Sequence, residues 1–138
     1  MKKILLILNM IISFSSFAYI NLYPTKFEKN ITNGAYEEFV LYNRTTQPKK
    51  YRLFIEDIGD KKDMSKWIQL YPKSILLKPL EEKSVKLYVK APKNTTKGVY
   101  SSNLVIKEIA IPNLNNKKNK TNVLTMVKLK LKGIVNHE

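Results

Sequence analysis

The sequence contains no cysteine, a single histidine and only two arginines. Without cysteine, the chain can form no disulfide framework, no thiolate nucleophile and no zinc–thiolate site. The one histidine, His137, is the penultimate residue, and chain ends usually fray. A Ser-His-Asp triad or a metal site with several histidine ligands has no place in such a chain. The composition therefore favours a protein without catalytic activity, metal or cofactor.

Because arginine is scarce, the positive charge behind the formal net charge of +14 comes almost entirely from lysine. Nucleic-acid phosphates and base edges are recognised best by the planar fork of arginine. Of the 25 basic residues, however, only Arg44 and Arg52 are arginines. The lysines are spread along nearly every segment, and the densest run, residues 117–120, lies in an asparagine-rich stretch. This distribution is typical of a solvated surface, so we expect no nucleic-acid partner.

Long apolar runs are also few, and the first has the three parts of a secretory signal peptide. Lys2 and Lys3 supply the positive charge, residues 4–12 are apolar with one interruption, and Ser16 and Ala18 are the small residues before a cleavage point. The run is shorter than the roughly 20 residues of a transmembrane helix. We expect residues 1–18 to be removed. Residues 19–138, with a charge of +12 after loss of the two lysines, then form one exported domain without a membrane anchor.

After residue 19 the hydrophobic pattern is typical of β-strands nearly throughout. Ser84–Lys90 alternates most clearly, with Val85, Leu87 and Val89 on one face, and Tyr51–Ile55 alternates in the same way. Turn signals separate further expected strands at residues 20–29, 37–42, 68–71, 74–77, 99–109 and 123–135. About seven short antiparallel strands without a long helical period predict an all-β, immunoglobulin-like sandwich of two sheets.

Three local features refine this prediction. Pro24 lies inside the first strand and cannot donate to a sheet ladder, so we expect that strand to pair with one sheet, break and then pair with the other. Residues 60–67 suit a single helical turn. Tyr100 begins a late strand, where sandwich domains place a corner tyrosine whose hydroxyl bonds to the backbone.

An acidic cluster, Glu56, Asp57, Asp60 and Asp63, is the remaining candidate for chemistry. Calcium takes several oxygen ligands from such loops. Lysines interleave these residues, however, and their spacing matches no known calcium loop. A solvated turn is the favoured interpretation, and we expect no metal site.

Several motifs follow one another in a particular order along the chain. They are Leu22-Tyr23-Pro24-Thr25-Lys26, residues 38–43, residues 67–72 followed by Leu77-Lys78-Pro79, Ile109-Ala110-Ile111-Pro112, and residues 122–131. Their order and spacing resemble the N-terminal immunoglobulin-like domain of periplasmic pilus chaperones, the PapD-like superfamily. The resemblance covers residues 20–135, nearly the whole expected mature chain.

The resemblance implies a periplasmic protein that binds partner proteins, such as pilin or fimbrial subunits, by strand addition. In the family, the partner's terminal carboxylate is held by an arginine of the first strand and a lysine of the last, and these roles fall on Lys26 and Lys130. Because lysine lacks the bidentate fork of arginine, we expect a weaker clamp here. In the alternative interpretation both lysines are solvated strand residues.

The resemblance also implies that alternating residues of the last strand are presented to the partner. Val123, Thr125 and Val127 are the candidate strand-binding residues, whereas Leu124 and Met126 occupy the opposite face. A period of two does not settle the register of the strand. In the alternative interpretation this is an ordinary sandwich strand whose apolar residues 127, 129 and 131 fill the core.

The chain has the length of one domain, whereas the family's chaperones carry a second immunoglobulin-like domain and bind between the two. Half of a chaperone, a compact one-domain variant and a relative with another role therefore all remain open. The second hypothesis is a structural or cell-surface module, such as an adhesin or envelope protein, without chaperone activity.

Overall fold

The computed structural model describes residues 21–112 and 124–137. The expected signal peptide, residues 1–18, lies outside the described residues, as does the strand-binding candidate Val123. Within the described part of the chain, no helix is long and apolar enough to cross a membrane.

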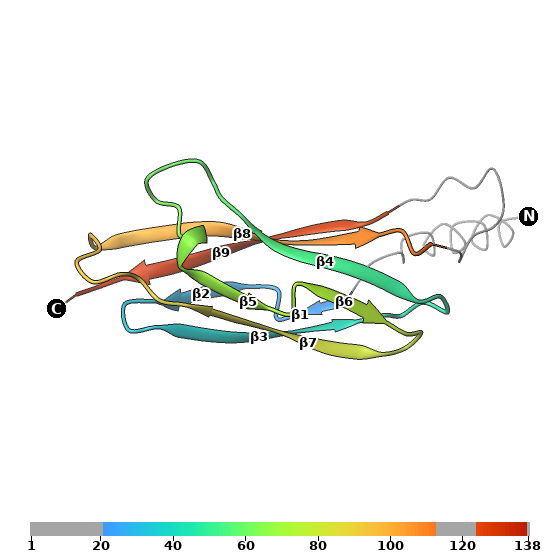
Figure 1. Cartoon of the computed structure of the whole chain (residues 1–138). Coiled ribbons are helices and arrows are strands. Elements are labelled where there is room, and N and C mark those ends of the chain that lie inside the picture. Colours follow the sequence, from blue (N-terminus) through green and yellow to red (C-terminus); the bar gives the residue numbers. More distant parts are fainter. Residues whose placement is uncertain (1–20, 113–123, 138) are drawn as a thin grey trace, which may run out of the picture.

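The described residues form two β-sheets that stack as layers (Figure 1). The four-stranded sheet has the order β1-β3-β7-β5, and the five-stranded sheet has the order β2-β9-β8-β4-β6. Their strands are β1 (Asn21–Tyr23), β2 (Phe27–Asn30), β3 (Ala35–Tyr42), β4 (Lys49–Glu56), β5 (Ile68–Tyr71), β6 (Ser74–Leu77), β7 (Glu82–Val89), β8 (Gly98–Ile109) and β9 (Met126–Val135). This arrangement confirms the predicted immunoglobulin-like sandwich.

Two prolines stand where the chain passes from one sheet to the other. Before Pro24, β1 pairs with β3, and after it β2 pairs with β9, which confirms the predicted switch of the first strand. The chain switches in the same way at Pro72, between β5 and β6. Because proline has no N–H to donate, it suits a point where ladder pairing stops. The described part therefore has nine strands rather than about seven, and the β2–β9 pair is parallel rather than antiparallel.

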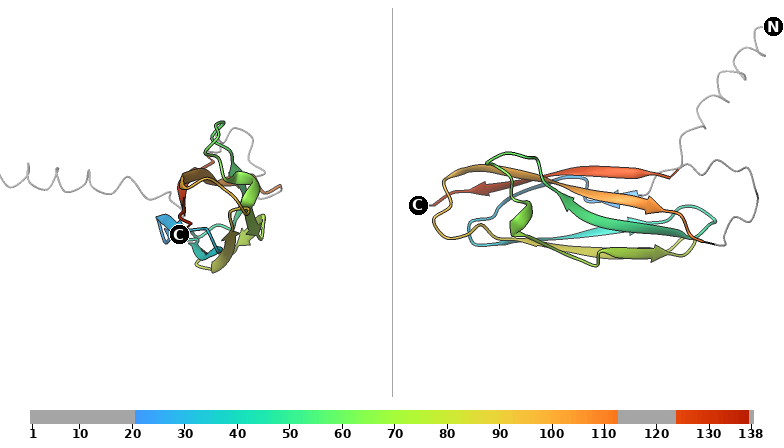
Figure 2. Two further views of the ribbon diagram at one scale, coloured as in Figure 1. Left: turned by 90° about the vertical axis from the view of Figure 1, so that its left-hand side faces the viewer. Right: turned by 45° about the horizontal axis from the view of Figure 1, so that its top comes forward.

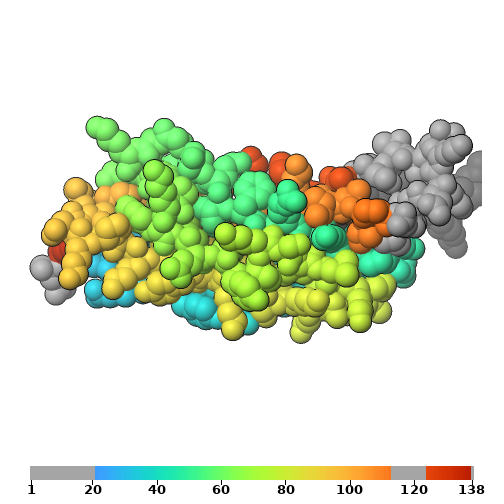
Figure 3. All heavy atoms as spheres, viewed as in Figure 1, coloured from blue at the N-terminus to red at the C-terminus, as the bar shows by residue number. Residues whose placement is uncertain are grey.

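The core lies between the sheets and is built by the inward residues of each strand. Val85, Leu87 and Val89 are completely buried, as the alternation of β7 predicts. Phe39 and Leu41 of β3 meet them with no exposed surface. Each such side chain contributes about 1.5–3 kcal/mol of hydrophobic stabilisation. The end-on view shows the two sheets curving around this core (Figure 2), and residues of β4 to β7 cover one flank (Figure 3).

The loop between β4 and β5 is fastened to β8. Its expected helical turn is present as a short 3-10 helix at Ser65–Trp67. Met64, just before it, is fully buried, and the Asp63 carboxylate accepts a hydrogen bond from the Ser102 hydroxyl of β8 at 2.8 Å. No described group of three or more acidic or histidine residues is placed to hold a metal ion.

Tyr100 is a corner tyrosine, as its position predicts. Its hydroxyl donates to the Thr96 carbonyl at 2.6 Å, and its ring lies 5.0 Å from that of Trp67 between centroids. A buried phenol needs a partner for its polar end, and the backbone carbonyl four residues earlier supplies one. This contact ties the loop before β8 to the sandwich.

Candidate functional site

Along its first half, strand β9 has one neighbouring strand among those that the structure describes. It pairs with β8 from Met126 to Val135, but with β2 only from Leu131 to Ile134. Among the described residues, the segment 126–130 therefore has β8 on one side and no paired strand on the other. Such an edge offers a row of backbone donors and acceptors to which an extended chain can bond. We call this segment the open edge.

The backbone groups that point outward from the open edge belong to even-numbered residues. The carbonyl of Thr125 accepts a hydrogen bond from β8 at 2.9 Å, and the carbonyl of Ile134 accepts one from the residue after β2 at 2.8 Å. Peptide groups alternate in direction along a strand. Met126, Lys128 and Lys130 therefore direct their N–H and C=O groups away from β8.

The side chains in the first half of β9 alternate with the same period of two, between exposed even-numbered and partly buried odd-numbered positions. Leu124 and Met126 are 45% and 55% exposed, whereas Val127 packs against the core. Thr125 is half-buried, and its hydroxyl bonds to the Glu108 carboxylate. Of the three strand-binding candidates, Val123 lies outside the described residues and the other two face inward. The exposed apolar side chains here are thus those of the alternative face, Leu124 just before the open edge and Met126 at its start.

The two candidate clamp residues, Lys26 and Lys130, lie at adjoining positions. They directly precede Phe27 and Leu131, which are register partners in the parallel β2–β9 pair. Both partners point into the core with at most 1% exposure, so both lysines point outward. Lys26 is 80% exposed and forms only a surface ion pair with Glu28, at 3.4 Å. Such pairs are worth about 0–1 kcal/mol, so an incoming carboxylate can displace this one.

Neighbouring lysines on β9 differ in their partners. Lys128 donates to both oxygens of Glu56, at 3.1 and 3.2 Å, and these hydrogen bonds lower the pKa of the Glu56 carboxyl. For Lys130, no acidic group of the described residues lies within ion-pair distance. The positive charge of Lys128 is therefore compensated within the sheet, whereas that of Lys130 is available to a ligand.

A buried carboxylate anchors the start of the open edge. Glu108 is 5% exposed, and its side chain accepts hydrogen bonds from the Thr125 N–H and hydroxyl, at 3.3 and 3.1 Å. Lys49 balances its charge at 3.4 Å. Burial, and then the Glu108 charge, raise the pKa of the adjacent Tyr51 phenol to about 12, so this phenol stays protonated. These contacts hold the chain in strand conformation where the edge begins.

The four-stranded sheet has a comparable open segment, but it is capped. Strand β3 pairs with β1 only from Val40 to Tyr42, so residues 35–39 have β7 as their single paired neighbour among the described strands. Lys29 reaches across, donates to the Tyr36 carbonyl at 2.7 Å and pairs with Glu37 at 3.1 Å. A lysine in this position blocks the addition of another strand. The sequence pattern did not reveal this cap, because it depends on β2 lying beside β3.

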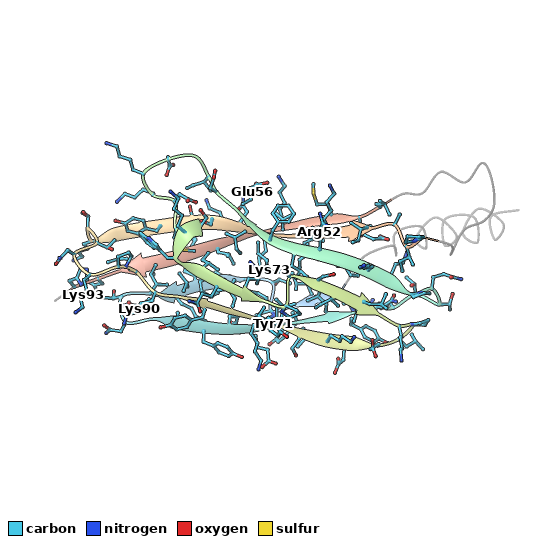
Figure 4. All side chains as sticks on the ribbon, in the orientation of Figure 1. Arg52, Glu56, Tyr71, Lys73, Lys90 and Lys93 are labelled. Carbon is cyan, nitrogen blue, oxygen red and sulfur yellow. The ribbon has the colours of Figure 1, made fainter. Side chains whose placement is uncertain are left out.

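A surface pocket of about 590 Å³ lies at the end of the sandwich that carries the C-terminus. Lys90 and Lys93 line it, and both are labelled at that end of the molecule in Figure 4. His137, also in the lining, contacts the Thr95 carbonyl at 2.9 Å. The lining also includes the Thr32 hydroxyl, which accepts a hydrogen bond from the Asn136 N–H at 2.9 Å, and among the described residues no hydrogen bond joins this hydroxyl to His137.

Comparison with known structures places this fold among those of the PapD-like proteins. The periplasmic chaperone SfaE is similar over 86% of this chain and 59% of its own, with a TM-score of 0.66 and 12% identity. A chain of the Salmonella enterica SafA pilin–SafB chaperone complex gives a TM-score of 0.67 at 12% identity over 88% of this chain and 57% of its own. The predicted resemblance is confirmed at the level of the fold.

The same fold also occurs outside the chaperones. PapD-like domain 7 of human CEP192 matches 91% of this chain and 97% of its own, with a TM-score of 0.59 and 13% identity. This chain spans somewhat more than half the length of the chaperones that it matches. No protein-family model matches the sequence, and no curated protein matches it either.

Proposed function

We propose that this chain is an exported protein-binding domain of the pilus-chaperone type, which holds an extended segment of a partner along the open edge of β9 in the periplasm. Partner backbone groups bond to Met126, Lys128 and Lys130, and exposed Leu124 and Met126 contact its side chains. A carboxylate at the end of that segment binds between Lys26 and Lys130. The partner is a pilin or fimbrial subunit; support comes from the SafA pilin–SafB chaperone complex, one chain of which shares the fold of this chain.

The difference between the half-open segments of β3 and β9 carries this proposal; among the described strands, the ends of β4 (residues 54–56) and β7 (residues 82–85) also have a single paired neighbour. The segment of β3 is capped by a lysine that occupies its outward carbonyl. For the open edge of β9, β8 is the only hydrogen-bonded strand among the described residues. An uncapped edge can serve as a template for an added strand, so the segment of β9 suits an extended partner, whereas the capped segment of β3 does not.

We expect Met126→Pro to abolish strand addition while leaving the fold intact. The N–H at position 126 points to the open side, so proline there removes a donor to the partner and none to β8. Loss of that hydrogen bond and distortion of the edge should weaken binding at least tenfold, about 1.4 kcal/mol. The measurement is titration of a candidate fimbrial subunit, with circular dichroism to verify folding.

The matched control for this experiment is Val127→Pro, which removes an N–H directed at β8. This variant should lose about 1–3 kcal/mol of stability, because proline removes a ladder hydrogen bond and leaves the acceptor on β8 without a partner. Tight binding of the subunit by folded M126P would rule out strand addition at this edge.

The carboxylate clamp is tested separately with Lys26→Ala plus Lys130→Ala. Both side chains are exposed, so the fold should be unaffected, whereas binding of a subunit with a free C-terminus should weaken about tenfold or more. A subunit with an amidated C-terminus should bind the wild type and the double variant with equal affinity. Equal affinities of wild type and double variant for the free carboxylate would disprove the clamp and leave the strand-addition proposal standing.

The second candidate function is a structural or surface module without chaperone activity. It is favoured by the similarity to the CEP192 domain, which covers 97% of that domain's own chain. Neighbouring genes for pilins and an outer-membrane usher would support the chaperone, whereas an isolated gene would support the module.

A further inference from the structure

The outer face of the four-stranded sheet carries most of the tyrosines. Five of the eight in the chain occupy its outward positions: Tyr23, Tyr36, Tyr42, Tyr71 and Tyr88. Tyr23 and Tyr71 are 76% and 75% exposed. We call this surface the tyrosine face. In Figure 4, Tyr71 is labelled below Glu56 of the five-stranded sheet.

Strand register makes the tyrosine face continuous. Tyr36 is the register partner of Tyr88, and Tyr23 is the partner of Val40 one strand away. Tyr71 stands opposite Lys86 on β5 and β7. Side chains on register partners share one side of a sheet and lie about 4.5–5.5 Å apart at Cβ. The face therefore carries tyrosine side chains on all four strands, around the central Glu38 and Lys86 positions.

The charge of the tyrosine face differs from that of the whole chain. The outward positions of β1, β3, β5 and β7 hold only three charged residues, Glu38, Glu82 and Lys86, with a sum of −1. The whole chain has a net charge of +14. Two copies of so basic a chain repel one another where their lysine-rich surfaces meet. Contact through the tyrosine face brings few lysines together, so this repulsion is weaker there.

The arrangement of its charges makes the tyrosine face complementary to itself. Glu38 and Lys86 are register partners on the two central strands, β3 and β7. A two-fold axis between them places the carboxylate of each copy opposite the ammonium group of the other, which is the pairing that an isologous interface requires. Tyrosine side chains around this centre add apolar area and hydroxyl groups, as they do in protein interfaces generally.

We propose that the tyrosine face is a homodimer interface, in which two sheets pack face to face around reciprocal Glu38–Lys86 pairs. The open edge of β9 belongs to the other sheet, so both copies keep it accessible in the dimer. Dimerisation is thus independent of strand addition.

Charge exchange tests this proposal on the full mature chain by sedimentation velocity over a concentration series. Wild type should show a concentration-dependent monomer–dimer equilibrium. Glu38→Lys and Lys86→Glu should each weaken the homodimer at least tenfold, because like charges then face each other. An equimolar mixture of E38K and K86E, or the E38K/K86E double variant, should restore dimers.

Matched charge changes on the five-stranded sheet serve as controls. Glu28→Lys and Lys107→Glu alter the net charge by the same amounts at exposed positions and should leave the dimer in place. Tyr71→Ala should weaken it without affecting the monomer fold, as verified by circular dichroism. A chain that remains monomeric at every concentration would overturn the proposal, as would dimers that E38K and K86E do not affect.

Discussion

Replacing Phe27 with alanine is expected to lower the free energy of unfolding by about 3–5 kcal/mol, as it does for large buried aromatic residues generally. Phe27 is 1% exposed and opens β2, the strand that closes the five-stranded sheet beside β9. Its register partner, Leu131, is completely buried. Alanine would remove the contact between these two side chains and leave a cavity at the point where the first strand joins its second sheet.

Urea denaturation followed by circular dichroism measures this effect, with Phe27→Leu as the control that preserves most of the volume. The leucine variant should lose less than half as much stability. Since Lys26 directly precedes Phe27, F27A should also weaken carboxylate binding by the surviving folded molecules. A loss of stability below about 1 kcal/mol would contradict the placement of Phe27 in the core.

The second large effect is expected at Asp63, which fastens the loop between β4 and β5. Its carboxylate accepts hydrogen bonds from Ser102 at 2.8 Å, from the Ile58 N–H at 3.2 Å, and from both the hydroxyl and the N–H of Ser65. Asp63→Asn replaces one acceptor oxygen with a donor that cannot accept from Ser65. Since hydrogen bonds to charged groups are worth about 1.5–3 kcal/mol each, we expect a loss of about 2 kcal/mol.

The contribution of Asp63 to the free energy of unfolding should depend on pH. Burial acts to raise the pKa of this carboxyl, but the hydrogen bonds from Ser65, Ser102 and Ile58 outweigh burial and hold the pKa below its ordinary value. A lowered folded-state pKa means that the stabilisation is complete above the unfolded-state pKa of about 3.9 and is lost as the pH falls through the folded-state value.

The difference in unfolding free energy between wild type and D63N isolates this group from the other carboxylates. It should be constant from neutral pH down to about pH 5 and shrink below about pH 4. An unchanged difference down to pH 2 would show that the charge of Asp63 does not hold the loop.

Several strands could be predicted because their pattern is local. The alternation of Val85, Leu87 and Val89 identifies the inward face of β7 without knowledge of its neighbours, since successive side chains of a strand point to opposite sides. Pro24 likewise marks the sheet switch, because the missing N–H is a property of the residue itself. Tyr100 could be placed as a corner tyrosine for the same reason, since its acceptor lies four residues earlier.

The candidate site could be predicted only in part. Lys26 and Lys130 were identified through the family resemblance, and the β2–β9 pairing brings them to adjoining positions. The sequence does not identify the exposed face of the last strand, because alternation gives two faces without saying which one meets the core. Contact of Val127 with the core makes Leu124 and Met126 the exposed pair.

The sequence by itself determined where most strands of the described domain lie, the inward face of β7 and the switch of the first strand at Pro24, because each depends on residues close together in the chain. The expected absence of cysteine chemistry follows from composition alone. Only the tertiary structure decided which strand edges are open. Among the described strands, β9 is unpaired on one side before β2 begins, β3 is capped where Lys29 of β2 passes it, and five tyrosines meet on one face. These features come from pairing between distant segments, for which one sequence carries no local signal.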